Sequence, residues 1–229
     1  MSFFTTVCIA RNEVQPENTV EINPKAAIRT EREMVVAAHP LAAKAGADIL
    51  KKGGTAIDAM VVVQMVLNLV EPQSSGIGGG AFLLFHDAQS NSLISLDGRE
   101  VAPVAADESM FLNLDGEPKR WFEMVPGGLS VGVPGTLALM DDAHARYGKL
   151  PWETLFEYAI KLSKNGFFVS RRLAESLKGY GGQRLQQFAA AADYFFPNGE
   201  PLASGDVLKN PKFAETLTAI QRDRGETFY

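Results

Sequence analysis

The longest apolar stretch of the chain runs from Ala56 to Val70, and only Asp58, Gln64 and Asn68 interrupt it. Apolar residues therefore occupy nearly every face of a helix drawn through this stretch, which is typical of a helix buried in a core. Thr55 and Asp58 match a capping box and predict where the helix begins. At about 15 residues the helix is too short to cross a bilayer. We expect it to be a core helix.

Apolar spacing, together with the positions of proline and glycine, predicts further helices. They cover residues 40–52, 107–112, 136–146, 152–165, 170–178 and 210–224. Residues 189–192 fit either a helix or a loop, and Gly179 to Gly182 is expected to break the helix before it. A short apolar run from Met34 to Ala38 predicts a buried strand.

Residues 72–103 predict a glycine-rich turn followed by a buried β-hairpin. Four glycines lie close together, at positions 76, 78, 79 and 80. They precede an apolar strand from Ala81 to Phe85 and a returning strand that contains Leu93, Ile94 and Leu96. The glycines lack the spacing of a phosphate-binding loop, and a strand rather than a helix follows them. We interpret them as sites of close backbone packing.

Composition narrows the class of protein. With 46% hydrophobic and 21% charged residues, this chain of 229 residues is typical of soluble globular proteins and has room for one large domain or two small ones. A net charge of −5 without a Lys/Arg cluster argues against nucleic-acid binding. Cys8 is the single cysteine, and the histidines at 39, 86 and 144 are widely separated. We therefore expect no disulfide and no metal site, and we interpret the histidines as packed or surface residues.

The first 33 residues differ from the rest of the chain. A short apolar run from Phe3 to Ala10 is followed by a polar segment rich in Glu, Asn and Pro. No Lys or Arg precedes the apolar run, so it fits a secretory signal poorly. We expect residues 1–33 to be a poorly ordered arm, with a signal remnant as the alternative, and residues 34–229 to form the domain.

Arg99 is the strongest candidate for a binding residue, because it follows the hairpin in the sequence DGRE. A guanidinium group presents a planar fork of donors that matches a carboxylate with two parallel hydrogen bonds. An arginine in such a place also forms surface ion pairs, and Asp97 and Glu100 are its acidic neighbours in the sequence. From the residues alone, a structural ion pair and a ligand contact both stay open.

Three ordered strings carry a resemblance to a known family. They are GGTAIDAMVVVQMVLNLVEPQSSGIGGGAFLLF, DGREVAP and VGVPGTLALMDDAHARYGKLPWETL. Together they resemble the large subunit of γ-glutamyltranspeptidase, and the similarity continues through NGFFVS and PNGEPLASGD to cover about Met34 to Tyr229. That family hydrolyses glutathione and transfers the γ-glutamyl group to water, amino acids or peptides.

The resemblance implies an α+β fold, namely a helix-rich and incomplete part of the αββα sandwich of N-terminal-nucleophile hydrolases. Members are zymogens that cut themselves autocatalytically into a large and a small subunit. The new N-terminal threonine of the small subunit is the nucleophile, and its α-amine is the base. In the motif matched by DGRE, an arginine binds the α-carboxylate of the donor, which implies that Arg99 is a substrate-binding residue. No cofactor and no metal are implied.

The resemblance also implies which parts of the enzyme lie elsewhere. The chain ends at Tyr229, before the segment where the family places its processing threonine, so we assign no catalytic residue to it. The expected partners are a γ-glutamyl donor such as glutathione and the small subunit; nucleic acid and a membrane span are not expected. Bacterial members are commonly periplasmic or secreted, and we expect the same location here.

Two alternatives to a γ-glutamyltransferase stay open. The first is a related amidase of the same fold, such as a cephalosporin or glutaryl acylase or a poly-γ-glutamate hydrolase. The second is a non-catalytic remnant or interaction domain. If the chain is one portion of a divided sandwich, it should expose unpaired strand edges and an apolar patch, and we expect it to be poorly soluble or to self-associate in isolation.

Overall fold

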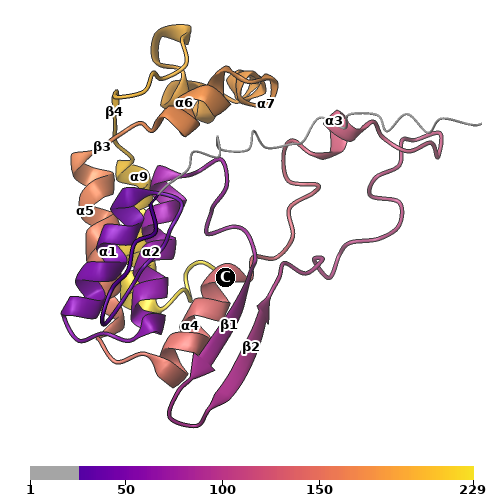
Figure 1. Ribbon diagram of the computed structural model, residues 1–229. Helices are drawn as coiled ribbons and strands as arrows, with labels where there is room; N and C mark the ends of the chain where they lie inside the picture. The colour runs from indigo at the N-terminus through magenta and orange to yellow at the C-terminus, as the bar shows by residue number, and fades with distance from the viewer. Residues whose placement is uncertain (1–25) are drawn as a thin grey trace, which may run out of the picture.

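A helical body with one β-hairpin on its side forms the architecture of the described residues, 26–229, in a computed structural model (Figure 1). Most of the predicted arm, residues 1–33, and Cys8 lie outside the described residues. The helices are α1 (Pro40–Lys51), α2 (Ala56–Val70), α3 (Trp121–Met124), α4 (Thr136–Tyr147), α5 (Glu157–Asn165), α6 (Arg171–Lys178), α7 (Tyr180–Gln183), α8 (Ala189–Phe195) and α9 (Pro211–Asp223). Short 3₁₀ segments are η1 (Trp152–Leu155), η2 (Arg184–Gln187) and η3 (Pro197–Gly199), and the strands are β1 (Ala81–Asp87), β2 (Ser92–Gly98), β3 (Phe167–Phe168) and β4 (Val207–Leu208). The chain is therefore a helix-rich mixture of α and β elements.

The predicted capping box at the start of α2 is confirmed. The Thr55 N–H donates to Asp58 Oδ2 at 2.7 Å, and the Asp58 N–H donates to Thr55 Oγ1 at 3.2 Å. Asp58 is fully buried, and its carboxylate also accepts the backbone N–H groups of Lys149 and Leu150. A buried carboxylate needs several hydrogen-bond donors. Asp58 therefore caps α2 and also fixes the position of residues 149–150, which follow α4.

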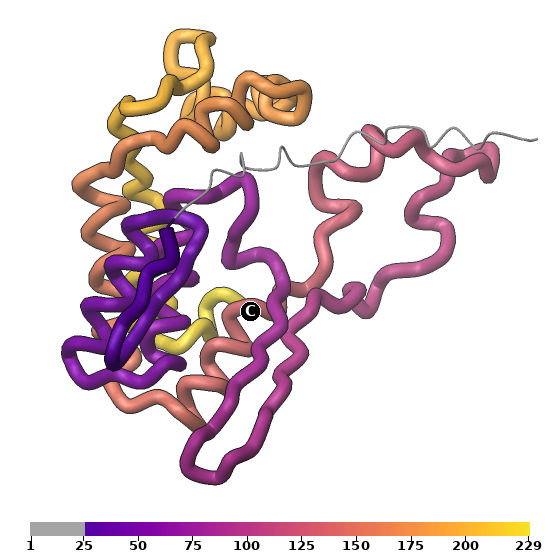
Figure 2. Tube along the Cα trace, in the orientation of Figure 1, coloured from indigo at the N-terminus to yellow at the C-terminus, as the bar shows by residue number. Residues whose placement is uncertain are grey.

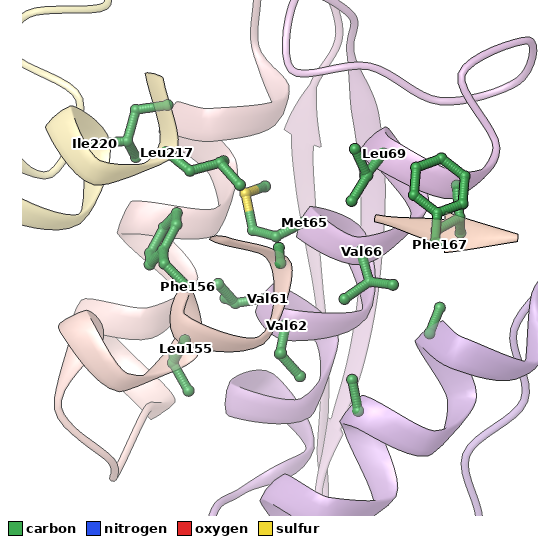
Figure 3. Close-up of a cluster of buried hydrophobic side chains, with 14 of the residues drawn as sticks. Val61, Val62, Met65, Val66, Leu69, Leu155, Phe156, Phe167, Leu217 and Ile220 are labelled. Atoms are coloured by element: carbon green, nitrogen blue, oxygen red, sulfur yellow. The ribbon is translucent and has the colours of Figure 1, made fainter. Parts of the chain in front are cut away.

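Helix α2 lies at the centre of the core, as its sequence predicts. Figure 3 shows its side chains between those of η1, α9 and β3. The labelled residues are Val61, Val62, Met65, Val66, Leu69, Leu155, Phe156, Phe167, Leu217 and Ile220. Helix α1 packs along α2, and α5 packs along α9 (Figure 1). Among the described residues, no helix is both long enough and apolar enough to span a membrane.

The β-hairpin is antiparallel, with a register that pairs Ala81 with Gly98 and Asp87 with Ser92. One face of the hairpin packs against α4, and the other face is open. On the open face Phe82 and Leu84 are 66% and 71% exposed. The prediction of a buried hairpin is therefore wrong for the open face, and most residues of the covered face are half-buried. A strand alternates its faces, and only one face is covered here.

A long excursion leaves the hairpin after Gly98 and returns to the body at α4. Figure 2 shows it extending away from the helical body between these points. Val101 and Val133 pair where it leaves and returns, with the Val133 N–H donating to the Val101 carbonyl at 2.8 Å. Farther out, the Arg184 guanidinium lies 3.9 Å from the ring centre of Phe122 in α3. The excursion is thus held at its base and at α3.

The strand predicted for Met34 to Ala38 is not formed. The segment shows alternating burial, and Val36 is 84% exposed, but it belongs to no strand. A strand needs a partner for its backbone groups, and no described segment pairs with it. The segment thus has the alternating burial of a strand but no paired strand beside it.

Three helix predictions differ from the structure in detail. The predicted helix 107–112 is a series of turns, because the Asp107 carboxylate accepts the Ser109 N–H and hydroxyl and so competes with helical hydrogen bonding. The predicted helix 152–165 is divided at Phe156 into η1 and α5. Helix α6 ends at Lys178 with Gly179 as its C-cap, which confirms the predicted break, but residues 180–182 then begin the short helix α7. Residues 189–192 belong to helix α8.

Candidate functional site

Arg99 lies directly after β2, at the junction of the hairpin and the excursion, and its side chain is exposed. It borders a hollow of about 310 Å³ between the end of β2 and the first turns of α4. The hollow is also lined by Leu96, Asp97, Gly98, Val101, Val133, Pro134, Gly135, Ala138, Leu139 and Asp142. The arginine therefore stands beside a depression on the surface, on the side where the hairpin meets the helical body.

The acidic neighbours of Arg99 are engaged with backbone. Asp97 Oδ1 accepts the Arg99 N–H at 2.9 Å, which fixes the turn that carries the arginine. The Glu100 carboxylate lies against the backbone of Gly80. Within the described residues, no carboxylate forms an ion pair with the Arg99 guanidinium. The structural ion pair that the sequence left open is not formed, and the guanidinium faces solvent.

Close backbone packing explains part of the glycine cluster. A Cβ on Gly80 would stand 2.8 Å from the Glu100 backbone nitrogen, and a Cβ on Gly132 would stand 3.1 Å from the Val101 carbonyl oxygen. Around Gly76 and Gly78, by contrast, the space within 4 Å is open. The packing interpretation is therefore confirmed at Gly80 and does not apply to Gly76 or Gly78.

The three histidines are packed or surface residues, as the sequence predicts, and the structure does not bring them together. His39 is buried at the start of α1, where its Nδ1 accepts the Leu41 N–H at 3.2 Å. His144 Nε2 lies 2.9 Å from the Leu150 carbonyl oxygen, and His86 is exposed in β1. No group of three His, Cys, Asp or Glu side chains in residues 26–229 is arranged to hold a metal ion.

An ion pair near the glycine turn, between a buried carboxylate and a half-buried guanidinium, has no signature in the sequence. Glu71 ends α2 and is 2% exposed, and its Oε2 accepts from Arg172 Nη1 in α6. Arg172 Nη2 also donates to Ser74 Oγ at 2.9 Å. The two charges are 101 residues apart in the chain. No local pattern links residues so far apart, so only the folded structure reveals the pair.

A second hollow, of about 390 Å³, lies between α5 and α9. Its lining consists of Glu157, Ile160, Lys161, Lys164, Asn165, Thr218 and Gln221. It holds none of the residues that the sequence singles out and lies on the far side of the helical body from the hairpin (Figure 1). We therefore take the smaller hollow beside Arg99 as the candidate site.

Comparisons with known proteins identify the family to which the chain is similar. The sequence profile described as Gamma-glutamyltranspeptidase matches residues 42–229. A glutathione hydrolase proenzyme of Bacillus subtilis is 43% identical over 196 residues, which is 86% of this chain and 33% of that protein. The chain thus spans about a third of the length of that relative.

Solved structures give the same result. The crystal structure of Helicobacter pylori γ-glutamyltranspeptidase matches with a TM-score of 0.82 and 34% identity, over 89% of this chain and 58% of that one. A cephalosporin acylase from Bacillus halodurans matches with a TM-score of 0.70 and 30% identity, over 92% of this chain and 41% of that one. On the profile match and these similarities, the chain belongs to the γ-glutamyltranspeptidase family.

Proposed function

We propose that the chain is the large-subunit portion of a γ-glutamyltransferase or glutathione hydrolase, and that Arg99 binds the α-carboxylate of the γ-glutamyl donor. The observation that carries this proposal is the solvent-facing Arg99 guanidinium beside a hollow, unneutralised by the neighbouring carboxylates of Asp97 and Glu100. A guanidinium without an ion-pair partner is available for two parallel hydrogen bonds to a carboxylate. Family membership supports the same role.

The reaction that we propose is acyl transfer through a threonine of the small subunit. The threonine hydroxyl attacks the carbonyl carbon of the γ-amide, and its proton passes to the threonine α-amine. The amide C–N bond breaks, and the leaving amine takes up the proton. Water or the amine of an acceptor then attacks the γ-glutamyl ester and releases the threonine. In this scheme Arg99 takes no part in bond breaking and fixes the end of the donor that carries the α-carboxylate.

The small subunit is the proposed protein partner. The exposed apolar side chains of Phe82, Leu84 and Leu93 share one face of the hairpin. The segment from Met34 to Ala38 has the alternating burial of a strand but pairs with no described strand. We propose that the rest of an αββα sandwich covers that face and pairs with that segment. By the same resemblance we propose that the protein is exported, which cell fractionation would test.

The experiment that tests the activity is an assay of the full-length precursor after self-cleavage. We expect release of p-nitroaniline from γ-glutamyl-p-nitroanilide and hydrolysis of glutathione, both inhibited by free glutamate because it offers the same α-carboxylate. A processed enzyme that leaves γ-glutamyl amides intact would overturn the proposal.

A related amidase is the second candidate, favoured by the structural match to the cephalosporin acylase. An acylase substrate without an amino-acid carboxylate would not need Arg99. Turnover of a glutaryl or cephalosporin amide that free glutamate does not inhibit would support this candidate over the first.

A further inference from the structure

Helix α4 begins without a side-chain cap of its own. Its N-cap residue is Gly135, which has no side chain to accept a hydrogen bond. The backbone carbonyl of Gly79 accepts the N–H groups of both Gly135 and Thr136 at 3.1 Å. In the first turn of the helix, the Ala138 N–H donates to the Tyr229 hydroxyl at 3.1 Å. Distant residues therefore accept the N–H groups of Thr136 and Ala138, two of the donors that a helix start leaves without an intrahelical partner.

Glycine is required at the N-cap because position 135 contacts the backbone of Gly98 and Arg99. A Cβ on Gly135 would stand 2.1 Å from the Gly98 carbonyl oxygen and 3.0 Å from the Arg99 carbonyl oxygen. The usual capping residues Ser, Thr, Asp and Asn all carry that Cβ, so none of them fits. A hydroxyl for the start of α4 therefore has to come from elsewhere in the chain.

Tyr229 supplies that hydroxyl, which acts both as a hydrogen-bond donor and as an acceptor. Its Oη donates to the Pro134 carbonyl oxygen at 2.8 Å and accepts from the Ala138 N–H. The Tyr229 ring packs edge-to-face on Phe228, with the ring centres 5.2 Å apart. Figure 1 shows this end of the chain beside the start of α4, where the hairpin meets the body. One hydroxyl thus ties the last residue before the helix cap to the first turn of the helix.

We propose that Tyr229 is a positioning residue for Arg99. The segment that its hydroxyl holds, Pro134 to Ala138, contains the glycine that abuts Gly98 and Arg99, and is preceded by Val133, which pairs with Val101. The backbone of Arg99 is thus bounded on both sides by one short segment. A bidentate contact weakens steeply when its donors shift. By fixing the segment from Pro134 to Ala138, the Tyr229 hydroxyl therefore also fixes the backbone that carries the Arg99 guanidinium. The inference rests on the proposed function of Arg99.

The test is Tyr229→Phe in the full-length protein, which removes the hydroxyl and keeps the ring. We expect KM for the γ-glutamyl donor to rise about 3- to 10-fold, as for loss of ordinary hydrogen bonds, with kcat changed less than about twofold. In an Arg99→Ala background the same substitution should leave KM unchanged, because the guanidinium that Tyr229 positions is already absent. Hydrogen–deuterium exchange should become faster in residues 96–101 and 132–139.

Ser163→Ala is the matched control. It also removes one hydroxyl hydrogen bond, from Ser163 Oγ to the Ala159 carbonyl at 2.8 Å, within helix α5 of the body. It should lower Tm without changing donor KM or exchange in residues 96–101. An equal rise of KM in the control, or unchanged exchange in 96–101 with Tyr229→Phe, would overturn the inference. If the wild-type protein has no γ-glutamyl activity, the proposed function fails, and the exchange measurement alone decides whether Tyr229 holds the Arg99 segment.

Discussion

The alpha carbon of Gly135 lies so close to the carbonyl oxygen of Gly98 that an added methyl group would stand 2.1 Å from it. This contact joins the end of the hairpin to the start of α4, and the candidate hollow opens beside it. The hairpin and the helix are therefore in direct backbone contact at this point, with no room for a side chain at position 135.

Gly135→Ala should destabilise the full-length protein by about 1–3 kcal/mol, because the methyl group meets backbone that cannot rotate away. Gly78→Ala is the matched control, since the space around Gly78 is open within 4 Å. Thermal unfolding of both variants measures the difference. Equal Tm values for the two variants would show that the backbone near Gly98 can move to accommodate a methyl group at position 135.

Arg99→Ala should raise KM for the γ-glutamyl donor about 10- to 100-fold, which corresponds to losing a charge-assisted pair of hydrogen bonds. Arg99→Lys should recover only part of this loss, because an ammonium group lacks the planar fork. Arg222→Ala, an exposed arginine in α9, serves as the control for loss of one positive charge. Steady-state kinetics that are unchanged in Arg99→Ala would remove this residue from the donor site.

Arg172→Met should destabilise the protein by about 2–4 kcal/mol, because it leaves the Glu71 carboxylate buried without its guanidinium partner. The control is Lys44→Met, which breaks the exposed Lys44–Asp48 pair and should change stability by less than about 1 kcal/mol. Denaturant unfolding of both variants distinguishes a pair with a buried carboxylate from a surface one. Similar midpoints would contradict the structural role of the Arg172–Glu71 pair.

Burial lowers the pKa of His39 below its usual value of 6.5, although the nearby Glu71 carboxylate partly opposes this shift. The folded state therefore binds the imidazole proton less readily than the unfolded state. The resulting stability is complete above about pH 6.5 and is lost as pH falls towards the lower folded pKa. His39→Asn keeps an acceptor for the Leu41 N–H and should flatten this part of the pH–stability curve. An unchanged curve would assign the acid sensitivity to other groups.

The open face of the hairpin should make the isolated chain self-associate, because Phe82, Leu84 and Leu93 are exposed together. Leu84→Lys should shift sedimentation of the isolated chain towards the monomer. In the full-length precursor the same substitution should impair folding, since the charge would be buried by the small subunit. A wild-type chain that sediments as a monomer would count against the expected cover.

Features set by neighbouring residues are those that the sequence predicts well. The capping box of Thr55 and Asp58 lies within four positions, and α2 forms at the predicted residues. The segment 34–38 fails as a strand because pairing depends on a partner that no local pattern supplies. Asp107 fails as a helix residue because its side chain satisfies nearby backbone donors better than a helix would.

At the candidate site, too, the sequence predicts local features and misses contacts between distant residues. Arg99 was identified through the DGRE string and its resemblance to a family motif. The sequence did not show that the Arg99 guanidinium forms no ion pair with Asp97 or Glu100. It also did not show that Gly135 contacts Gly98, because this contact joins residues that are far apart in the chain. The Tyr229 hydroxyl joins residues more than 90 positions away from it, so no spacing rule reaches it.

The pairing of Val101 with Val133 has a consequence for how this protein tolerates change in length. Within the excursion, residues 113–116 form a turn in which the Gly116 N–H donates to the Asn113 carbonyl at 3.0 Å. Because the two ends of the excursion are paired at its base, residues inserted at this Gly116 turn would lengthen a loop that is already closed. Such insertions add little entropic cost and leave the base of the loop in place. The Gly116 turn is thus a suitable point for a reporter or an affinity tag, because nothing lies within 4 Å of a Cβ built on Gly116.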